Sequence, residues 1–301
     1  MAYAGNSATS RGVTQRTTKR RSNRGDAHAG GTPPPDTGRG HRLLGRGGGD
    51  AVLLVHASFG ADWFAPLAGL LPGLRVVRTH RAGYGRSRDL SGRLSVTDHT
   101  RHLADVLGAR GIGQAHVVGH STGGTLALQL AAAHPGIVRS MVLLEPALPY
   151  AADEPRSDAM RRAVTAAEQG DLARAYGHFP GSVCSPGYLD VMTRVLGTEG
   201  FRKSVLSGRY FFEHERAAFA AWDADAAGLE ALRQPVLLVA GGEGERLDSP
   251  YRARNRALAA RLARAEQVTL PGVSHAMPLE DPGLVAWTVL DFVRRHPVDA
   301  V

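Results

Sequence analysis

Short apolar runs recur along the chain after residue 50, and the stretches between them carry helical patterns. A continuous apolar run of this length is typical of a strand that is buried on both faces of a sheet. Six such runs occur: AVLLVHA (51–57), LRVVRTH (74–80), AHVVGH (115–120), SMVLLEP (140–146), PVLLVAGG (235–242) and AEQVTLPG (265–272). Residues 41–50, HRLLGRGGGD, are too short and too rich in glycine to predict a leading hairpin.

Helical patterns occupy most intervals between these runs. Apolar positions recur near helical spacing in residues 97–111, where Gly111 ends the pattern, and TLALQLAAAHPG ends at Pro135. A last helix is predicted over about 281–295. Strands that alternate with helices predict right-handed βαβ units. We therefore expect an α/β fold, in which a mostly parallel sheet carries helices on both faces.

The alternation breaks between residues 147 and 234, where no strand-like run appears. This segment contains helical stretches such as DAMRRAVTAAEQG and YLDVMTRVLG. It also holds an aromatic patch: Tyr210, Phe211, Phe212, Phe219 and Trp222. We predict a helical lid over 147–234, inserted between two parts of one core, 41–146 and 235–301.

The first forty residues differ in composition from the rest of the chain. They are rich in Ser, Thr, Gly, Pro and Arg, and hold seven Lys or Arg residues against two Asp, in a chain of net charge +8. Such a segment has too few apolar residues to form a core. We predict a disordered basic leader over 1–40. Basic tails can contact nucleic acid, but we expect this one to be incidental.

The composition is that of a globular protein with one large domain: 301 residues, 43% hydrophobic and 21% charged. Cys184 is the single cysteine, so no internal disulfide forms, and no CxxC pattern predicts a metal. No apolar run reaches the roughly 20 residues of a membrane span, and no signal-peptide pattern is seen. We expect a cytoplasmic protein with no membrane partner; the oligomeric state is left open.

The segment VVGHSTGG places Ser121 in a G-x-S-x-G pattern, Gly119 to Gly123, between a predicted strand and a predicted helix. This context is that of a nucleophile elbow. The turn is tight, so glycines at both flanks avoid collisions, and the serine hydroxyl projects above the carboxyl edge of the sheet. The N-terminus of the following helix favours negative charge there.

A serine hydroxyl needs a base, and a histidine base needs an acid to orient it. His275, in LPGVSHAMPLEDP, follows the last predicted strand and has the right place in chain order. Two acids are candidates: Glu245, just past the strand 235–242, and Glu145, at the end of the strand 140–146. Asp248 is a third choice. We place Glu245 slightly ahead of Glu145.

An oxyanion hole needs two backbone N–H donors. One is expected from Thr122, directly after the serine. The other is expected from the loop after the first strand, HASFG, most simply the Ser58 amide. His56 and His120 are interpreted as structural residues that flank the site.

Taken together, VLLVHASFG, THRAGYGRS, VVGHSTGG, MVLLEPALP, PVLLVAGGEGE and LPGVSHAMPLEDP resemble the α/β-hydrolase fold superfamily, over about residues 50–296. The segment LLEPALP, followed by YFFEHERAAFAAW, is similar to a branch of general hydrolases with a helical lid. Three positions depart from the usual pattern. Ala57 replaces a glycine, His80 stands where Asp is often found, and Glu245 stands where Asp is commoner.

The resemblance implies a serine hydrolase that acts on an ester, thioester or related carbonyl substrate with no cofactor. The aromatic lid favours a small-molecule substrate with a partly apolar acyl or alkyl group. The same site would also suit an acyltransferase, a carbon–carbon bond hydrolase or a cofactor-free haloperoxidase-type enzyme. A non-catalytic ligand-binding protein is the alternative from another class.

Overall fold

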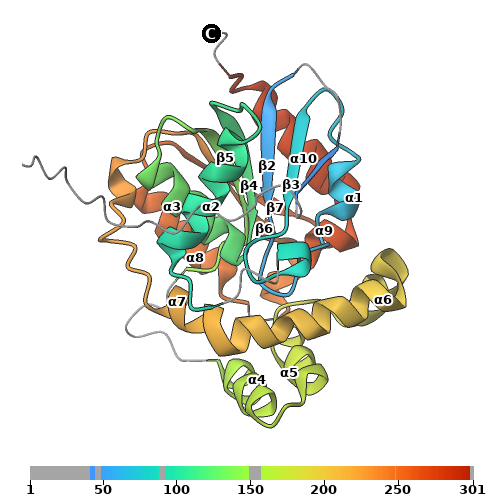
Figure 1. Ribbon diagram of the computed structural model, residues 1–301. Helices are drawn as coiled ribbons and strands as arrows, with labels where there is room; N and C mark the ends of the chain where they lie inside the picture. Colours follow the sequence, from blue (N-terminus) through green and yellow to red (C-terminus); the bar gives the residue numbers. More distant parts are fainter. Residues whose placement is uncertain (1–40, 45–48, 88–91, 149–156, 248, 299–301) are drawn as a thin grey trace, which may run out of the picture. The chain divides into compact units, whose positions relative to one another are not determined.

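A computed structural model describes residues 41–44, 49–87, 92–148, 157–247 and 249–298 (Figure 1). The leader predicted for residues 1–40 lies outside them. In the described part of the chain, no helix is both long and apolar enough to cross a membrane.

The core of the fold is a seven-stranded sheet with the strand order β1-β3-β2-β4-β5-β6-β7. Strand β1 pairs antiparallel with β3, and all other neighbours are parallel. The strands are β1 (His41–Leu44), β2 (Ala51–Val55), β3 (Arg75–Thr79), β4 (Ala115–His120), β5 (Val138–Leu144), β6 (Val236–Gly241) and β7 (Ala265–Leu270). The six predicted strands are β2 to β7. The edge strand β1 was not predicted, because its four residues pair through backbone groups that leave no apolar pattern.

Helices cover both faces of the sheet, as predicted. The outer helices are α1 (Ala65–Ala68), α2 (Val96–Gly108), α3 (Thr122–Ala133), α8 (Tyr251–Arg261), α9 (Met277–Glu280) and α10 (Pro282–Arg294). Side chains of α2, α3 and α8 share one buried cluster with Leu53 and Val55 of β2. Side chains of α1, α9 and α10 share another with Val52 and Leu54 of the same strand. Alternate residues of one strand therefore supply two cores, one on each side of the sheet in Figure 1.

Local signals fix the ends of the outer helices. Ser95 precedes α2 and forms a capping box with Asp98, in which each side chain accepts from the other residue's backbone N–H. Asp281 caps α10 by accepting from the Leu284 amide, and Pro282 occupies the first turn. Both helices begin and end close to the bounds predicted from the sequence.

The segment between β5 and β6 contains helices; of the residues predicted as an insert, 147–234, the structure describes 147–148 and 157–234. Its elements are α4 (Asp158–Glu168), α5 (Leu172–His178), the 3₁₀ helix η2 (Pro180–Ser182), α6 (Tyr188–Tyr210), the π-helix η3 (Phe211–Glu215), α7 (Arg216–Ala220) and the 3₁₀ helix η4 (Leu229–Ala231). In Figure 1 these helices lie below the sheet, at the carboxyl ends of the parallel strands. Phe211 packs on Phe59 of the loop after β2, with ring centroids 4.8 Å apart.

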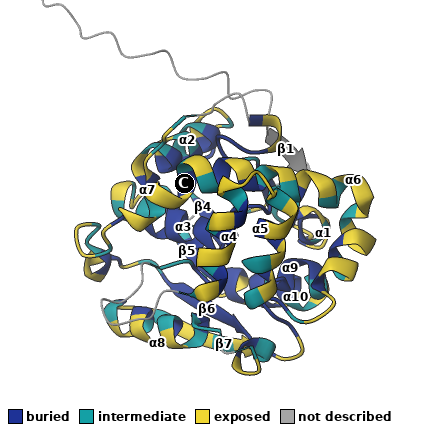
Figure 2. Ribbon diagram, turned by 90° about the horizontal axis from the view of Figure 1, so that it is seen from below, coloured by how far each residue is buried: buried dark blue, intermediate teal, exposed yellow. Residues whose placement is uncertain are grey.

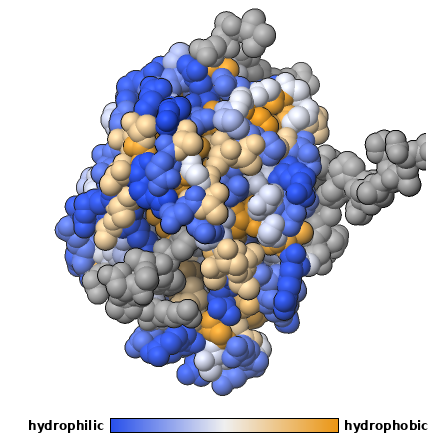
Figure 3. Space-filling model, turned by 90° about the vertical axis from the view of Figure 1, so that its left-hand side faces the viewer, coloured by the Kyte–Doolittle hydropathy of each residue, from blue (hydrophilic) through white to orange (hydrophobic). Residues whose placement is uncertain are grey.

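The buried strands lie at the centre of the view in Figure 2, and the surrounding helices expose their outer faces. On the face shown in Figure 3, hydrophilic residues divide the apolar ones into small patches, as is usual for the surface of a folded domain.

Candidate active site

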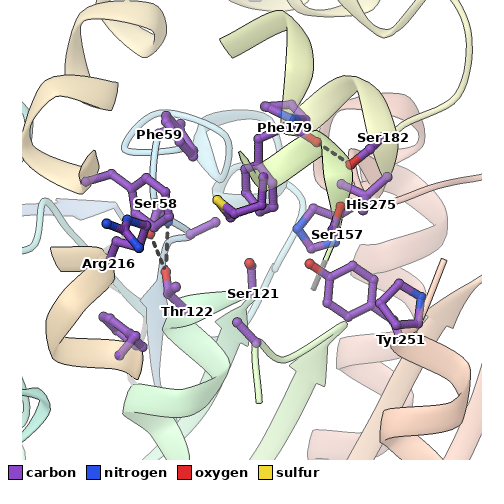
Figure 4. A pocket seen from close by; sticks show the side chains of 18 of the residues that line it. Ser58, Phe59, Ser121, Thr122, Ser157, Phe179, Ser182, Arg216, Tyr251 and His275 are labelled. Atoms are coloured by element: carbon purple, nitrogen blue, oxygen red, sulfur yellow. Dashed lines mark hydrogen bonds between the residues drawn. The ribbon is translucent and has the colours of Figure 1, made fainter. Parts of the chain in front are cut away.

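Ser121 stands in a strained turn between β4 and α3. Its backbone has φ 52° and ψ −120°, a region that non-glycine residues rarely occupy. A side chain at Gly119 would place its Cβ 2.5 Å from the carbonyl oxygen of Gly123, and one at Gly123 would collide with the backbone of Val55. Both glycines are therefore required by the turn, and Ser121 lines a cavity above it (Figure 4).

The turn that holds Ser121 lies at the point where the order of the strands in the sheet changes direction. Strand β2 lies between β3 and β4 in the sheet. After β2 the chain passes to β3 on one side, and it then crosses to β4 on the other side. In open α/β sheets, ligands bind outside the carboxyl ends of strands at such a point. Ser58 follows β2 and Ser121 follows β4, so the topology brings the two predicted segments together.

His275 lies in the loop between β7 and α9 and lines the same cavity as Ser121. Its Nδ1 is hydrogen-bonded to Oε2 of Glu145 at 2.7 Å. The Tyr251 ring stacks on the imidazole, with centroids 4.5 Å apart and planes within 3°. His120 Nε2 donates to the His275 carbonyl oxygen at 2.9 Å, so ring and backbone are both held.

Glu145 is the acid that the structure brings to His275. It follows β5 with φ 44°, and its side chain is buried. The Gly241 amide donates to Oε1 at 2.8 Å, which leaves Oε2 for His275.

The preference for Glu245 over Glu145 was therefore wrong on geometry. Glu245 ends a short 3₁₀ turn after β6, and its side chain is 71% exposed, where it pairs with Arg252. The chain turns outward immediately after β6, which carries Glu245 away from His275. Asp248, the third choice, lies outside the described residues.

Burial shifts both members of the Glu145–His275 pair toward their uncharged forms. It raises the pKa of Glu145 to about 8, although the bond from Gly241 acts in the opposite direction. It lowers the pKa of His275 to about 3. Near neutral pH a neutral carboxyl group therefore lies beside a neutral imidazole, and the pair holds one proton more than its carboxylate–imidazole form. Once that proton is lost, the carboxylate accepts from Nδ1–H, and Nε2 is free to act as a base.

The predicted oxyanion donors are differently placed. Thr122 is the first residue of α3, where backbone N–H groups lack partners within the helix. The Ser58 amide, however, already donates to the Thr122 side-chain oxygen, Oγ1, at 2.8 Å. An oxyanion would have to replace that oxygen to reach the Ser58 amide. The next residue, Phe59, has φ 66°, and its amide donates to no acceptor among the described residues.

His56 and His120 serve backbone groups, in line with the structural role expected for them. His56 bonds the Ala57 carbonyl oxygen through Nδ1, and its Nε2 accepts from the Arg81 amide at 3.0 Å. His80 similarly accepts from the Arg86 amide through Nδ1, at 3.0 Å. An imidazole at position 80 therefore holds the turn after β3 by accepting from its backbone.

Tyr251 and Glu215 are site residues that the sequence analysis missed. The Tyr251 side chain interacts with Ser121, and burial raises the pKa of Tyr251, so the phenol stays protonated. Glu215 of η3 lies beneath the Ser58 loop and accepts from Ser58, Arg81 and Tyr84. Neither residue carries a recognisable motif, since both act across long sequence separations.

The cavity has a volume of about 900 Å³ and lies between the core and the helical insert. Figure 4 shows Ser121 between Ser58 and Thr122 on one side and His275 and Tyr251 on the other. Most of the wall is apolar: Phe59, Trp63, Met160, Val164, Phe179, Phe211 and Phe219. Three arginines also line it, Arg161, Arg216 and Arg254, and among the described residues no carboxylate does. In the described part of the chain, no cluster of side chains suits a metal ion.

Comparison with known proteins shows that the chain is similar to alpha/beta hydrolases. The model of the alpha/beta hydrolase family matches residues 52–286. A putative carbamate hydrolase RutD of Azorhizobium caulinodans is 38% identical over 101 residues, which cover 32% of this chain and 38% of the relative. A 2-hydroxymuconate semialdehyde hydrolase of Pseudomonas putida is 38% identical over 122 residues, 36% of this chain and 43% of the relative. The matched region thus spans about two fifths of these relatives.

Solved structures share the fold over a much longer region. The enol-lactonase from Burkholderia xenovorans has a TM-score of 0.70 at 24% identity, over 84% of this chain and 95% of that one. A thermophilic esterase from Thermogutta terrifontis has a TM-score of 0.71 at 19% identity, over 86% and 94%. At these identities the likeness concerns the fold.

Proposed function

The chain belongs to the alpha/beta hydrolase family, and on this premise we propose that it is a serine hydrolase of carboxylic esters or closely related acyl compounds. One observation carries the proposal: a serine on a strained elbow lines one cavity with a histidine that is oriented by a buried carboxylate. Ser121 is the nucleophile, His275 the base and Glu145 the acid.

The first half of the reaction forms an acyl-enzyme. Nε2 of His275 takes the proton of Ser121 while Oγ attacks the substrate carbonyl carbon, and the carbonyl oxygen becomes an oxyanion. Protonated His275 then gives its proton to the leaving alcohol, and the bond from carbon to that oxygen breaks. In the second half, water gives a proton to His275 and attacks the acyl carbon. The bond from that carbon to Ser121 Oγ then breaks, His275 returns the proton to Oγ, and the acid is released.

The charged and polar groups around Ser121 suit these reaction steps. When His275 becomes protonated, the Glu145 carboxylate stabilises it at 2.7 Å. The oxyanion is held by the Thr122 amide and by an amide of the Ser58–Phe59 loop. The Tyr251 ring stacks on the His275 imidazole, and its side chain interacts with Ser121, so Tyr251 helps to hold both groups in place.

The cavity wall indicates the kind of acyl group. Its aromatic and aliphatic side chains favour a partly apolar small molecule. The arginines that line it favour a neutral or anionic substrate over a cationic one, because no carboxylate among the described residues would pair with a cation.

A panel of p-nitrophenyl esters tests the proposal, with acetate, hexanoate and hemisuccinate as acyl groups. We expect hydrolysis by the wild type, and a loss of about 10⁴-fold or more in Ser121→Ala. Thr193→Ala is the matched control, because this exposed hydroxyl on α6 bonds only its own helix. If the folded wild type hydrolyses none of these esters, or if Ser121→Ala retains the rate, the proposal is wrong.

A further inference from the structure

The carboxylate of Glu215 lies in the helical insert but is completely buried against the core. Glu215 is the last residue of the π-helix η3, which joins α6 to α7. π-helical turns are rare and are frequent at functional sites. The partners of this carboxylate belong to the core, so the side chain links two parts of the fold.

Three core side chains donate hydrogen bonds to Glu215. Ser58 Oγ donates to Oε2 at 2.6 Å, the Tyr84 hydroxyl donates to the same oxygen, and Arg81 Nη1 donates to Oε1. Nε2 of His99, in α2, lies 3.9 Å from Oε1. One carboxylate of the insert therefore contacts the loop after β2, the turn after β3 and helix α2.

The charge state of Glu215 sets the direction of these bonds. Burial alone would raise the pKa of Glu215, but the positive charge of Arg81 and the bonds from Ser58 and Tyr84 keep it below its ordinary value. Glu215 is thus a carboxylate that only accepts hydrogen bonds. Ser58 therefore donates its one hydroxyl proton to Glu215.

The direction of the Ser58 bond also determines which hydroxyl donates between Ser58 and Thr122. Oγ of Ser58 lies 2.9 Å from Oγ1 of Thr122. Because the Ser58 proton points to Glu215, the proton of this bond comes from Thr122. Oγ1 of Thr122 in turn accepts from the Ser58 amide at 2.8 Å and from Arg81 Nη2 at 3.3 Å. Glu215 and Arg81 thereby fix two residues that flank the nucleophile.

We propose that Glu215, together with Arg81, is a positioning residue for the oxyanion hole, which links the seating of the helical insert to the geometry around Ser121. The inference rests on the proposed function of that site. Neither Glu215 nor Arg81 lines the cavity in the described part of the chain. Their effect therefore reaches a substrate only through the Ser58 loop and Thr122.

The test measures the second-order rate of labelling by a fluorophosphonate, together with kcat and KM for an ester. Ser58→Ala keeps the backbone amide and the Arg81–Glu215 pair but removes the link to Glu215. Glu215→Gln removes the charge. We expect each to lower the labelling rate and kcat by about 10-fold to about 100-fold, with KM changed by less than about twofold.

The matched control is Glu213→Gln, in the same π-helix. Glu213 is 52% exposed and pairs with Arg209 at the surface, so we expect wild-type rates within about twofold. We also expect the double variant, Ser58→Ala with Glu215→Gln, to be little slower than the slower single variant, since both remove one link. Ser58→Ala decides the question if Glu215→Gln does not fold.

The outcomes separate this inference from the proposed function. If the wild type is labelled and folded Ser58→Ala is labelled equally fast, the positioning role is refuted while the serine hydrolase stands. A rise in KM with unchanged kcat would equally refute it, because that pattern indicates substrate contact instead. If the wild type is not labelled, the proposed function fails and this inference fails with it.

Discussion

Replacing Glu145 with glutamine removes the carboxylate that orients His275. Glu145 is 1% exposed; its Oε1 accepts from the Gly241 amide, and its Oε2 is hydrogen-bonded to Nδ1 of His275. Glutamine preserves the shape but presents an amide NH₂ that cannot accept from Nδ1–H. The imidazole then adopts the other tautomer, in which Nε2 carries a proton and is no longer a base. Loss of the acid in this way lowers kcat by about 10⁴-fold, or about 5.5 kcal/mol of transition-state stabilisation.

The matched variant is Glu245→Gln, at the residue that the sequence analysis preferred. Its side chain is 71% exposed and pairs with Arg252 at the surface. Such pairs contribute about 1 kcal/mol or less to stability, and Glu245 does not contact His275. We therefore expect kcat within about twofold of the wild type.

Steady-state ester hydrolysis by both variants is the assay, with thermal unfolding as the control for folding. A folded Glu145→Gln variant with near-wild-type kcat would refute the assignment. So would a ranking in which Glu245→Gln is the slower enzyme.

Four further expectations concern the site and the core. Activity, measured as kcat/KM, should rise with pH through an apparent pKa near 8, because the Glu145–His275 pair must lose a proton before His275 can act; a flat profile from pH 6 to 9 would contradict this. Because the folded state raises the pKa of Glu145 from 4.5 to about 8, its contribution to stability falls as pH rises through that window, and Glu145→Gln should abolish this fall in urea titrations. Gly123→Ala should prevent folding or lower the melting temperature strongly, since its Cβ would meet the Val55 backbone. Leu126→Ala, in the fully buried face of α3, should lower the free energy of unfolding by about 2–5 kcal/mol; a change below about 1 kcal/mol in urea denaturation would argue against that packing.

The parallel strands and the elbow could be predicted because their signals are local. Apolar runs such as that of β2 reflect burial on both faces, and glycines on both sides of Ser121 reflect the space inside one turn. Chain order then places His275 at the same edge of the sheet. These features depend on neighbours in sequence or on the general topology of βαβ units.

The acid and the buried network could not be predicted in the same way. Glu145 and Glu245 both follow strands that end at one edge, and only the backbone at each residue decides which side chain turns inward. The bond between Arg81 and Glu215 joins residues 134 positions apart. Such a contact depends on how the insert packs on the core, which no local pattern records.

Catalysis as proposed here requires that the strained turn presents Ser121 as an activated nucleophile. Intact-protein mass spectrometry after reaction with a fluorophosphonate measures this directly, and peptide mapping locates the adduct. We expect one adduct per wild-type chain, on Ser121, and none on folded Ser121→Ala. An unlabelled wild type, or an adduct on another residue that persists in Ser121→Ala, would contradict it.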